Sequence, residues 1–164
     1  MAIPVGFDIL LKNHPYHYQI KSLVDGPVAA PSYLHAPCCI QASYALNLSG
    51  APSEKGDYYV PEYARKSRFF PDKSGRLYLI EVCDMGAYLN NRYGIADNYK
   101  GTKAQMEEKI AGRKGIIRFG KAHIDLWDGE QFHQDGMRLP DFPVIGVWDA
   151  PSVKTLGIFF WEAR

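Results

Sequence analysis

The sequence predicts an α+β fold in which helices come first along the chain and an antiparallel sheet follows. Two observations lead to this fold class. Helical spacing of apolar residues, with start and stop signals, occurs at residues 38–48, at 77–93 and from Thr102 onward. From Gly115 the pattern changes to short runs of β-branched and aromatic residues between turn signals. Because the chain has 164 residues and 46% of them are hydrophobic, we expect residues 1–164 to form a single domain.

The segment that precedes residue 38 is rich in proline, with five prolines. It is expected to be irregular and to lie over the core. The first helix is predicted over residues 38–48, because Pro37 suits a first helical turn and Gly50 suits the stop. Apolar residues surround this helix nearly completely, so we expect it to be buried in the middle of the domain.

Residues 51–76 combine Gly, Pro, Ser and mixed charges and are interpreted as a long loop that could cover a groove. The next predicted helix covers residues 77–93 and ends at Gly94. A third, shorter helix begins at Thr102, which forms a capping box with Gln105.

Strands are predicted for "GIIRF" (115–119) and "HIDLW" (123–127). "DGEQFHQD" (128–135) is interpreted as a turn and a returning strand. "VIGVW" (144–148) and "LGIFFWEA" (156–163) are predicted as a final pair of strands joined by "DAPSVKT".

Charge and hydropathy exclude several classes of partner. The formal net charge is +1, from 19 basic and 18 acidic residues, so nucleic acid is not expected as a partner. No segment approaches the roughly 20 apolar residues that a membrane-spanning helix needs. The start, "MAIPVGFDILLKN", lacks the basic and apolar regions of a signal peptide. We therefore expect synthesis in the cytoplasm and, for work elsewhere, another export route.

Three cysteines are present, and Cys38 and Cys39 are adjacent in the chain. Adjacent cysteines do not easily bridge each other, although either could pair with Cys83 in an oxidising compartment. No CxxC pattern accompanies a pair of histidines, so we expect neither a metal site nor a cofactor.

Cys38 lies where a helix can activate a thiol. The positive end of the helix dipole and its unpaired N–H groups lower a thiol pKa there, and the same groups can bind an oxyanion. A base is also needed, and His123 opens the alternating strand "HIDLW". Ile124 and Leu126 are expected to face the core, so His123 should point to the opposite side. If the helix start packs there, Cys38 and His123 meet.

A third group should orient the histidine. A hairpin turn over residues 128–130 places Asp135 opposite His123, whereas a two-residue turn places Gln134 there. We favour Asp135, because a carboxylate stabilises the charged imidazole. Asp125, on the same strand face as His123, is the second choice, or a residue that contacts substrate.

Two motifs resemble those of the fourth amidase effector family of type VI secretion systems. "CCIQASYALNLSGAP" is similar to its nucleophile helix, which has the pattern Cys-Ala-(apolar)-Arg-(apolar)-Ser followed by Leu-Asn and Gly. "KGIIRFGKAHIDLWDGEQF" resembles its Gly-Ile-Ile-x-Phe and His-Ile-Asp-Leu-Trp motif, and "LGIFFWEA" its final strand. The similarity extends from about Asn13 to the end of the chain.

The resemblance implies a papain-like, NlpC-type fold and a cysteine amidase without a cofactor. Members of that family are toxins that a type VI secretion apparatus injects into the periplasm of rival Gram-negative cells. They cut peptidoglycan stem peptides, and the bond implied is that between γ-D-glutamate and meso-diaminopimelate. A cognate immunity protein blocks the active site in the producer.

Position by position, Cys38 matches the family's nucleophile and His123 its base, while Cys39 takes the place of the usual Ala. The usual Arg of the helix is replaced by Gln41, followed by Ala42, which could change the substrate preference. The candidates for supporting or substrate-binding roles are Gln41, Asp125 and Gln134.

Three alternatives stay open. The chain could be a housekeeping cell-wall peptidase or another papain-like acyl hydrolase or transferase with a different bond specificity. It could be a catalytically silent binding protein, although Cys38 and His123 are both present. Finally, Cys39 could be the nucleophile in place of Cys38.

Overall fold

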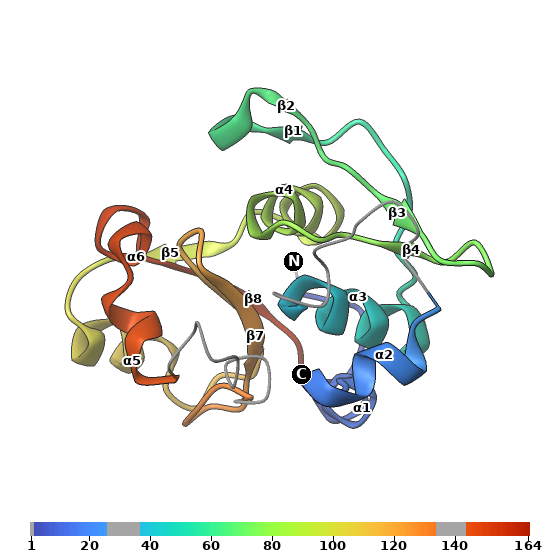
Figure 1. Cartoon of the computed structure of the whole chain (residues 1–164). Coiled ribbons are helices and arrows are strands. Elements are labelled where there is room, and N and C mark those ends of the chain that lie inside the picture. The colour runs from blue at the N-terminus through green and yellow to red at the C-terminus, as the bar shows by residue number, and fades with distance from the viewer. Residues whose placement is uncertain (1, 26–36, 134–143) are drawn as a thin grey trace.

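The fold is built around an antiparallel sheet. A computed structural model describes residues 2–25, 37–133 and 144–164 (Figure 1). Within the described part of the chain this sheet has four strands in the order β5-β8-β6-β7. Their bounds are β5 (Asp97–Tyr99), β6 (Gly115–Phe119), β7 (His123–Trp127) and β8 (Ile158–Glu162). Because β7 stands at one end of this order, its outer edge is available to a helix or a functional group.

Helices lie on both faces of the sheet, and two small hairpins form separate two-stranded sheets. The helical elements are α1 (Phe7–Asn13), η1 (His17–Gln19), α2 (Ile20–Leu23), α3 (Cys38–Leu48), η2 (Pro61–Tyr63), α4 (Val82–Tyr93), α5 (Lys103–Ile110), η4 (Val144–Asp149) and α6 (Pro151–Leu156). The hairpins pair β1 (Tyr59–Val60) with β2 (Arg65–Lys66), and β3 (Phe70–Pro71) with β4 (Leu77–Tyr78). In Figure 1 the β1–β2 hairpin reaches out beyond α4.

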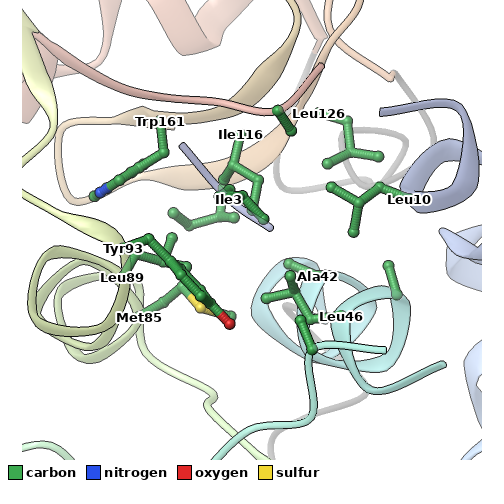
Figure 2. Packing of buried hydrophobic residues seen from close by; sticks show 14 of the residues in the cluster. Ile3, Leu10, Ala42, Leu46, Met85, Leu89, Tyr93, Ile116, Leu126 and Trp161 are labelled. Carbon is green, nitrogen blue, oxygen red and sulfur yellow. The ribbon is translucent and has the colours of Figure 1, made fainter. Parts of the chain in front are cut away.

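Two hydrophobic clusters show which helices cover which face. Figure 2 shows the first cluster, in which Ile116, Leu126 and Trp161 of the sheet pack against α1, α3 and α4. On the opposite face, Ile117 and Phe160 pack with residues of α5, η4 and α6. The sheet is therefore the middle layer of three, and every residue of β6 and β7 is buried.

The helix α3 has the predicted bounds and lies in the interior. Eight of its residues are buried, including four polar or thiol-bearing ones in its first two turns. Its polar side chains bond to neighbouring backbone. The Leu79 N–H donates to Ser43 Oγ over 3.1 Å, and Asn47 Nδ2 donates to the Leu77 carbonyl over 3.0 Å. These bonds fix the helix against β4 as well as against the sheet.

Several predicted elements differ from the structure. Residues 77–78 form strand β4, and the helix begins only at Val82. "VIGVW" belongs to the 3₁₀ helix η4, and "DAPSVKT" contributes most of α6. An apolar run of five residues does not distinguish a strand from a buried helix, which explains the second error. The proline-rich start contains α1, η1 and α2 in its described part, and β5 was not predicted.

The first residues of the chain bond to the last strand. The Ile3 N–H donates to the Glu162 carbonyl over 2.8 Å, and the Phe7 N–H donates to the Arg164 carbonyl, also over 2.8 Å. Ile3 and Phe7 are buried in the first cluster, beside Ala163. None of the helices in the described residues combines the length and the apolar character that spanning a bilayer requires.

Candidate active site

Cys38 is the first residue of α3, and its side chain is 7% exposed. The helix begins after Pro37, and no side chain of the described residues caps this end. The first N–H groups of a helix have no partners within the helix and carry its positive dipole end. The Cys38 sulfur therefore lies beside donors that stabilise negative charge.

The tight turn between β6 and β7 positions His123. In the register of the two strands, Phe119 lies opposite His123, which leaves three residues in the turn. The first is Gly120, at φ +51°, where an added Cβ would come within 2.6 Å of the Ser152 backbone. Only glycine suits this position. His123 is 2% exposed, and its ring lies 6.1 Å from that of Phe119, measured between centroids.

Cys38 and His123 meet, as the sequence predicted, at the outer edge of β7. The hydrogen bond from the Cys39 thiol holds the pKa of Cys38 well below its ordinary value, although burial opposes this. A hydrogen bond with His123 and the Ile124 backbone N–H lower that pKa further. The helix also packs on Ile124 and Leu126, the strand face opposite to the one expected.

The pKa of His123 moves in the complementary direction. Burial lowers this pKa, but hydrogen bonds with Asp125 and Cys38 outweigh burial and raise it to about 9. A thiol with a lowered pKa beside an imidazole with a raised one favours the thiolate–imidazolium pair. Such a pair is the reactive form of a cysteine nucleophile.

Asp125 is the carboxylate that contacts His123. The Nε2 atom of His123 lies 2.8 Å from Asp125 Oδ2, and the Leu126 N–H donates to Asp125 Oδ1 over 2.7 Å. Asp125 is fully buried; burial raises its pKa, and the bonds from His123 and Leu126 counteract this. With Nε2 engaged by Asp125, Nδ1 is the ring nitrogen left for the Cys38 sulfur.

Asp135 and Gln134, the two residues selected by hairpin register, lie outside the described residues. The register itself differs from the one expected. Trp127 bridges Phe132, so four residues, 128–131, form the turn instead of two or three. The register argument is therefore wrong at the described end of the hairpin, whereas a role of Asp135 stays a prediction.

Two further histidines lie beside this group, and the sequence analysis did not single them out. The Nδ1 atoms of His14 and His133 are 2.7 Å apart. Burial, followed by the charges of His133 and His123, holds the pKa of His14 well below its ordinary value. His14 directly follows α1, and His133 follows the bridge at Phe132. Because the two positions are far apart in the sequence, no local motif predicts that they meet.

Comparison with known proteins places the chain. Residues 34–161 match the family model described as type VI secretion system, amidase effector protein 4, or Tae4. The chain belongs to this family. It is thus a type VI secretion amidase effector that acts on peptidoglycan, and the resemblance seen in its motifs is confirmed. No protein with curated annotation matches the chain in sequence.

Solved Tae4 structures share the fold. The effector Tae4 from Enterobacter cloacae superposes with a TM-score of 0.68 at 22% identity, covering 99% of both chains. The Tae4–Tai4 effector–immunity complex from the same organism gives 0.67 at 23% identity, over 99% of this chain and 100% of that one. The Tae4/Tai4 system from Salmonella typhimurium gives 0.67 at 21% identity, with the same coverage. The predicted α+β class is confirmed.

Gln41 stands where the Tae4 resemblance expects Arg. It is fully buried, and its Nε2 donates to the Pro15 carbonyl over 2.8 Å. Its Oε1 is buried without a hydrogen-bond partner among the described residues. Gln41 therefore joins α3 to the N-terminal segment, a supporting contact close to His14.

The other two cysteines have different surroundings from Cys38. All three are free thiols in the structure and all are buried. Burial raises the pKa of Cys39 well above its ordinary value, and a hydrogen bond with Cys38 raises it further. Burial also raises the pKa of Cys83, whose Sγ lies 3.5 Å from Arg118 Nη2. Among the three, only Cys38 combines a lowered pKa with a histidine partner.

Proposed function

We propose that this effector is a cysteine amidase that cleaves the bond between γ-D-glutamate and meso-diaminopimelate in peptidoglycan stem peptides. Cys38 is the nucleophile and His123 the general acid and base. Asp125, whose carboxylate contacts His123, is the proposed orienting group, and Asp135, which the sequence favoured, is the alternative. The contact between a low-pKa cysteine at a helix start and a histidine held by a carboxylate carries this proposal.

The first half of the reaction forms a thioester. The Cys38 thiolate attacks the γ-carbonyl carbon of the D-glutamyl residue, and the carbonyl oxygen becomes an oxyanion. The backbone N–H of Cys38, at the uncapped start of α3, is suited to bind that oxyanion. His123 donates its Nδ1 proton to the diaminopimelate nitrogen, the C–N bond breaks, and the amine leaves.

The second half restores the enzyme. With its proton lost, His123 accepts a proton from a water molecule, which attacks the thioester carbon. The C–S bond then breaks, and the glutamyl carboxylate is released with Cys38 again a thiolate. Asp125 keeps Nε2 protonated during both steps and leaves Nδ1 to exchange the proton.

Delivery and protection follow from family membership and are part of the proposal. A type VI secretion apparatus carries the effector into the periplasm of a Gram-negative target, where its stem peptides are exposed. Solved Tae4 proteins are described as complexes with the immunity protein Tai4. We infer that a cognate immunity protein binds this chain in the producing cell and covers the groove around Cys38.

Digestion of purified Gram-negative peptidoglycan tests this function. Wild type and Cys38→Ala are incubated with sacculi, and the released muropeptides are identified by mass spectrometry. We expect fragments split between D-glutamate and diaminopimelate with wild type and none with the variant, whose fold is checked by circular dichroism.

Two other outcomes count against parts of the proposal. Fragments that depend on Cys38 but arise from a different bond would keep the cysteine amidase and replace the substrate bond. Equal fragments from wild type and the folded Cys38→Ala protein would remove Cys38 as nucleophile.

A further inference from the structure

Three potential metal ligands lie together next to the proposed catalytic pair. One ring nitrogen of His14, one of His133 and a carboxylate oxygen of Asp125 all lie within 4.8 Å of one another. His14 directly follows α1, Asp125 belongs to β7, and His133 lies in the segment after β7. His14 and Asp125 are buried and His133 is half-buried.

The contact between the two histidines is unusual for a purely structural role. Their Nδ1 atoms are 2.7 Å apart, so a single proton lies between them and one ring presents its lone pair to the other. The remaining nitrogen of His14, Nε2, is buried and has no hydrogen-bond partner among the described residues.

We propose that His14, His133 and Asp125 form a binding site for a divalent transition-metal ion of the zinc class. Two imidazole nitrogens and one carboxylate oxygen are the donor set that Zn²⁺ commonly takes, with a water molecule in the fourth position. The ion replaces the proton between the two rings, and that proton is released to solvent.

Both the histidines and Asp125 must adjust, because the Asp125 oxygen, now within 4.8 Å of the two nitrogens, has to approach to the spacing of tetrahedral ligands. Zn²⁺ binds nitrogen at about 2.0–2.1 Å in a tetrahedral arrangement, which sets two ligand nitrogens roughly 3.3 Å apart. The two rings must therefore separate by about 0.6 Å from their present 2.7 Å contact. Each carboxylate oxygen has two lone pairs, so Asp125 can ligate an ion and still accept from Leu126.

An entry path exists. A cavity of about 580 Å³ has His14 and His133 in its wall, together with residues of α1, η1 and α3. Its walls also include Tyr16 and Tyr44. An ion that enters this cavity reaches both imidazoles before it reaches the fully buried Asp125.

Occupancy would inhibit the amidase, and this part rests on the proposed function. The reaction with Cys38 and His123 needs no metal, so the ion acts as a reversible inhibitor and is not a cofactor. An ion on Asp125 competes for the carboxylate with His123, whose Nε2 atom lies 2.8 Å from Asp125 Oδ2. The imidazole ring then loses the contact that holds it toward Cys38, and turnover falls.

Binding is measured first, in the Cys38→Ala protein, so that neither the reactive thiolate nor turnover contributes. ZnCl₂ is titrated by isothermal calorimetry, and CoCl₂ is added separately to record the visible bands of a tetrahedral Co²⁺ site. We expect one equivalent to bind. His133→Gln and His14→Gln are each introduced into Cys38→Ala. Each should weaken Zn²⁺ binding at least about tenfold, because losing even a residue that only supports a metal ligand costs about that much affinity.

His17→Gln is the matched control, because it removes one imidazole but none of the three ligands, and it should bind like the parent. His14 is buried, so its variant can fail to fold; the half-buried His133 keeps the test decisive. No binding by folded Cys38→Ala, or equal affinity after His133→Gln, overturns the site.

Inhibition is measured separately on the wild type, with peptidoglycan as substrate. Added Zn²⁺ should reduce turnover, and His133→Gln should need at least about tenfold more Zn²⁺ for the same fractional loss. Binding at the cluster without any change in turnover overturns the inhibitory role alone. If the wild type shows no amidase activity, the proposed function fails, while the calorimetry still decides the site.

Discussion

His123 and Asp125 are separated by one residue on strand β7, and their side chains meet with 2.8 Å between Nε2 and Oδ2. Residues two apart on a strand share a face, so a single strand supplies both the histidine and its partner. The same strand edge also offers the Ile124 N–H to Cys38 and the Leu126 N–H to Asp125. The single strand β7 therefore positions the histidine, its carboxylate partner and the backbone N–H group that contacts Cys38.

Replacing Asp125 by Asn should reduce kcat/KM for peptidoglycan by about 10²-fold or more. The amide can donate to Nε2 and so favour the tautomer that lacks a lone pair on Nδ1, where Cys38 needs one. Asp135→Asn, measured in parallel, tests the residue that hairpin register selected. If Asp135→Asn loses more activity than Asp125→Asn, Asp135 is the orienting group and the Asp125 contact has another role.

The two adjacent cysteines should respond differently to alanine. Cys38→Ala should abolish turnover, because no other thiol in the chain has a lowered pKa and a histidine partner. Cys39→Ala should stay active, but the pKa of Cys38 should rise because its largest lowering influence, the Cys39 thiol, is lost. Muropeptide release and thiol alkylation measure the two effects. An inactive Cys39→Ala beside an active Cys38→Ala would make Cys39 the nucleophile.

Activity should persist at pH values where an ordinary thiol is protonated. The lowered pKa of Cys38 means that its thiolate is present below the usual thiol range of about 8.5 and is lost only at still lower pH. On the alkaline side, kcat/KM should fall as pH rises through about 9, where His123 gives up the proton needed by the leaving amine. Profiles are recorded in metal-free buffer. A single rise with a midpoint near 8.5 and no alkaline fall would contradict the ion pair.

Removing Arg65 should destabilise the fold by about 3–5 kcal/mol, because it leaves a buried carboxylate without its partner. Arg65 Nη1 lies 2.7 Å from Asp84 Oδ1, and the Asp84 side chain is fully buried in α4. Urea unfolding of Arg65→Ala measures the loss. Lys66→Ala is the matched control, since Lys66 pairs with Asp57 at the exposed surface over 3.3 Å and should change stability little. Equal losses in both variants would show that the buried pair contributes nothing specific.

Local signals accounted for the parts of the fold that were predicted well. Pro37 and Gly50 set the ends of α3, and the capping box of Thr102 and Gln105 begins α5, with both of its hydrogen bonds present. The site residues Cys38 and His123 were found in the same way, from a helix start and an alternating strand. Residues 77–78 and 144–148 were assigned to the wrong element type because tertiary packing decides between strand and helix for short apolar runs.

The residue opposite His123 in the hairpin could not be fixed from the sequence, because it depends on turn length, whereas the contacting Asp125 lies on the same strand and was the second choice. Asp128 Oδ1 accepts the N–H groups of both Glu130 and Gln131, which stabilises a four-residue turn. Counting shorter turns shifted the expected register. The His14–His133 contact joins residues 119 positions apart. No periodicity or motif spacing reports a contact of that kind, so a metal site of this type was not expected.

The bonds from Ile3 to Glu162 and from Phe7 to Arg164 make the chain almost a closed ring. A short peptide linking the two ends, with the chain reopened at the exposed β3–β4 turn, should therefore give a circular permutant with the same core. The same contacts also affect folding during synthesis. Ile3 and Phe7 can form their hydrogen bonds only after β8 and the residues that follow it have left the ribosome. The first hydrophobic cluster is therefore incomplete in a nascent chain that lacks β8.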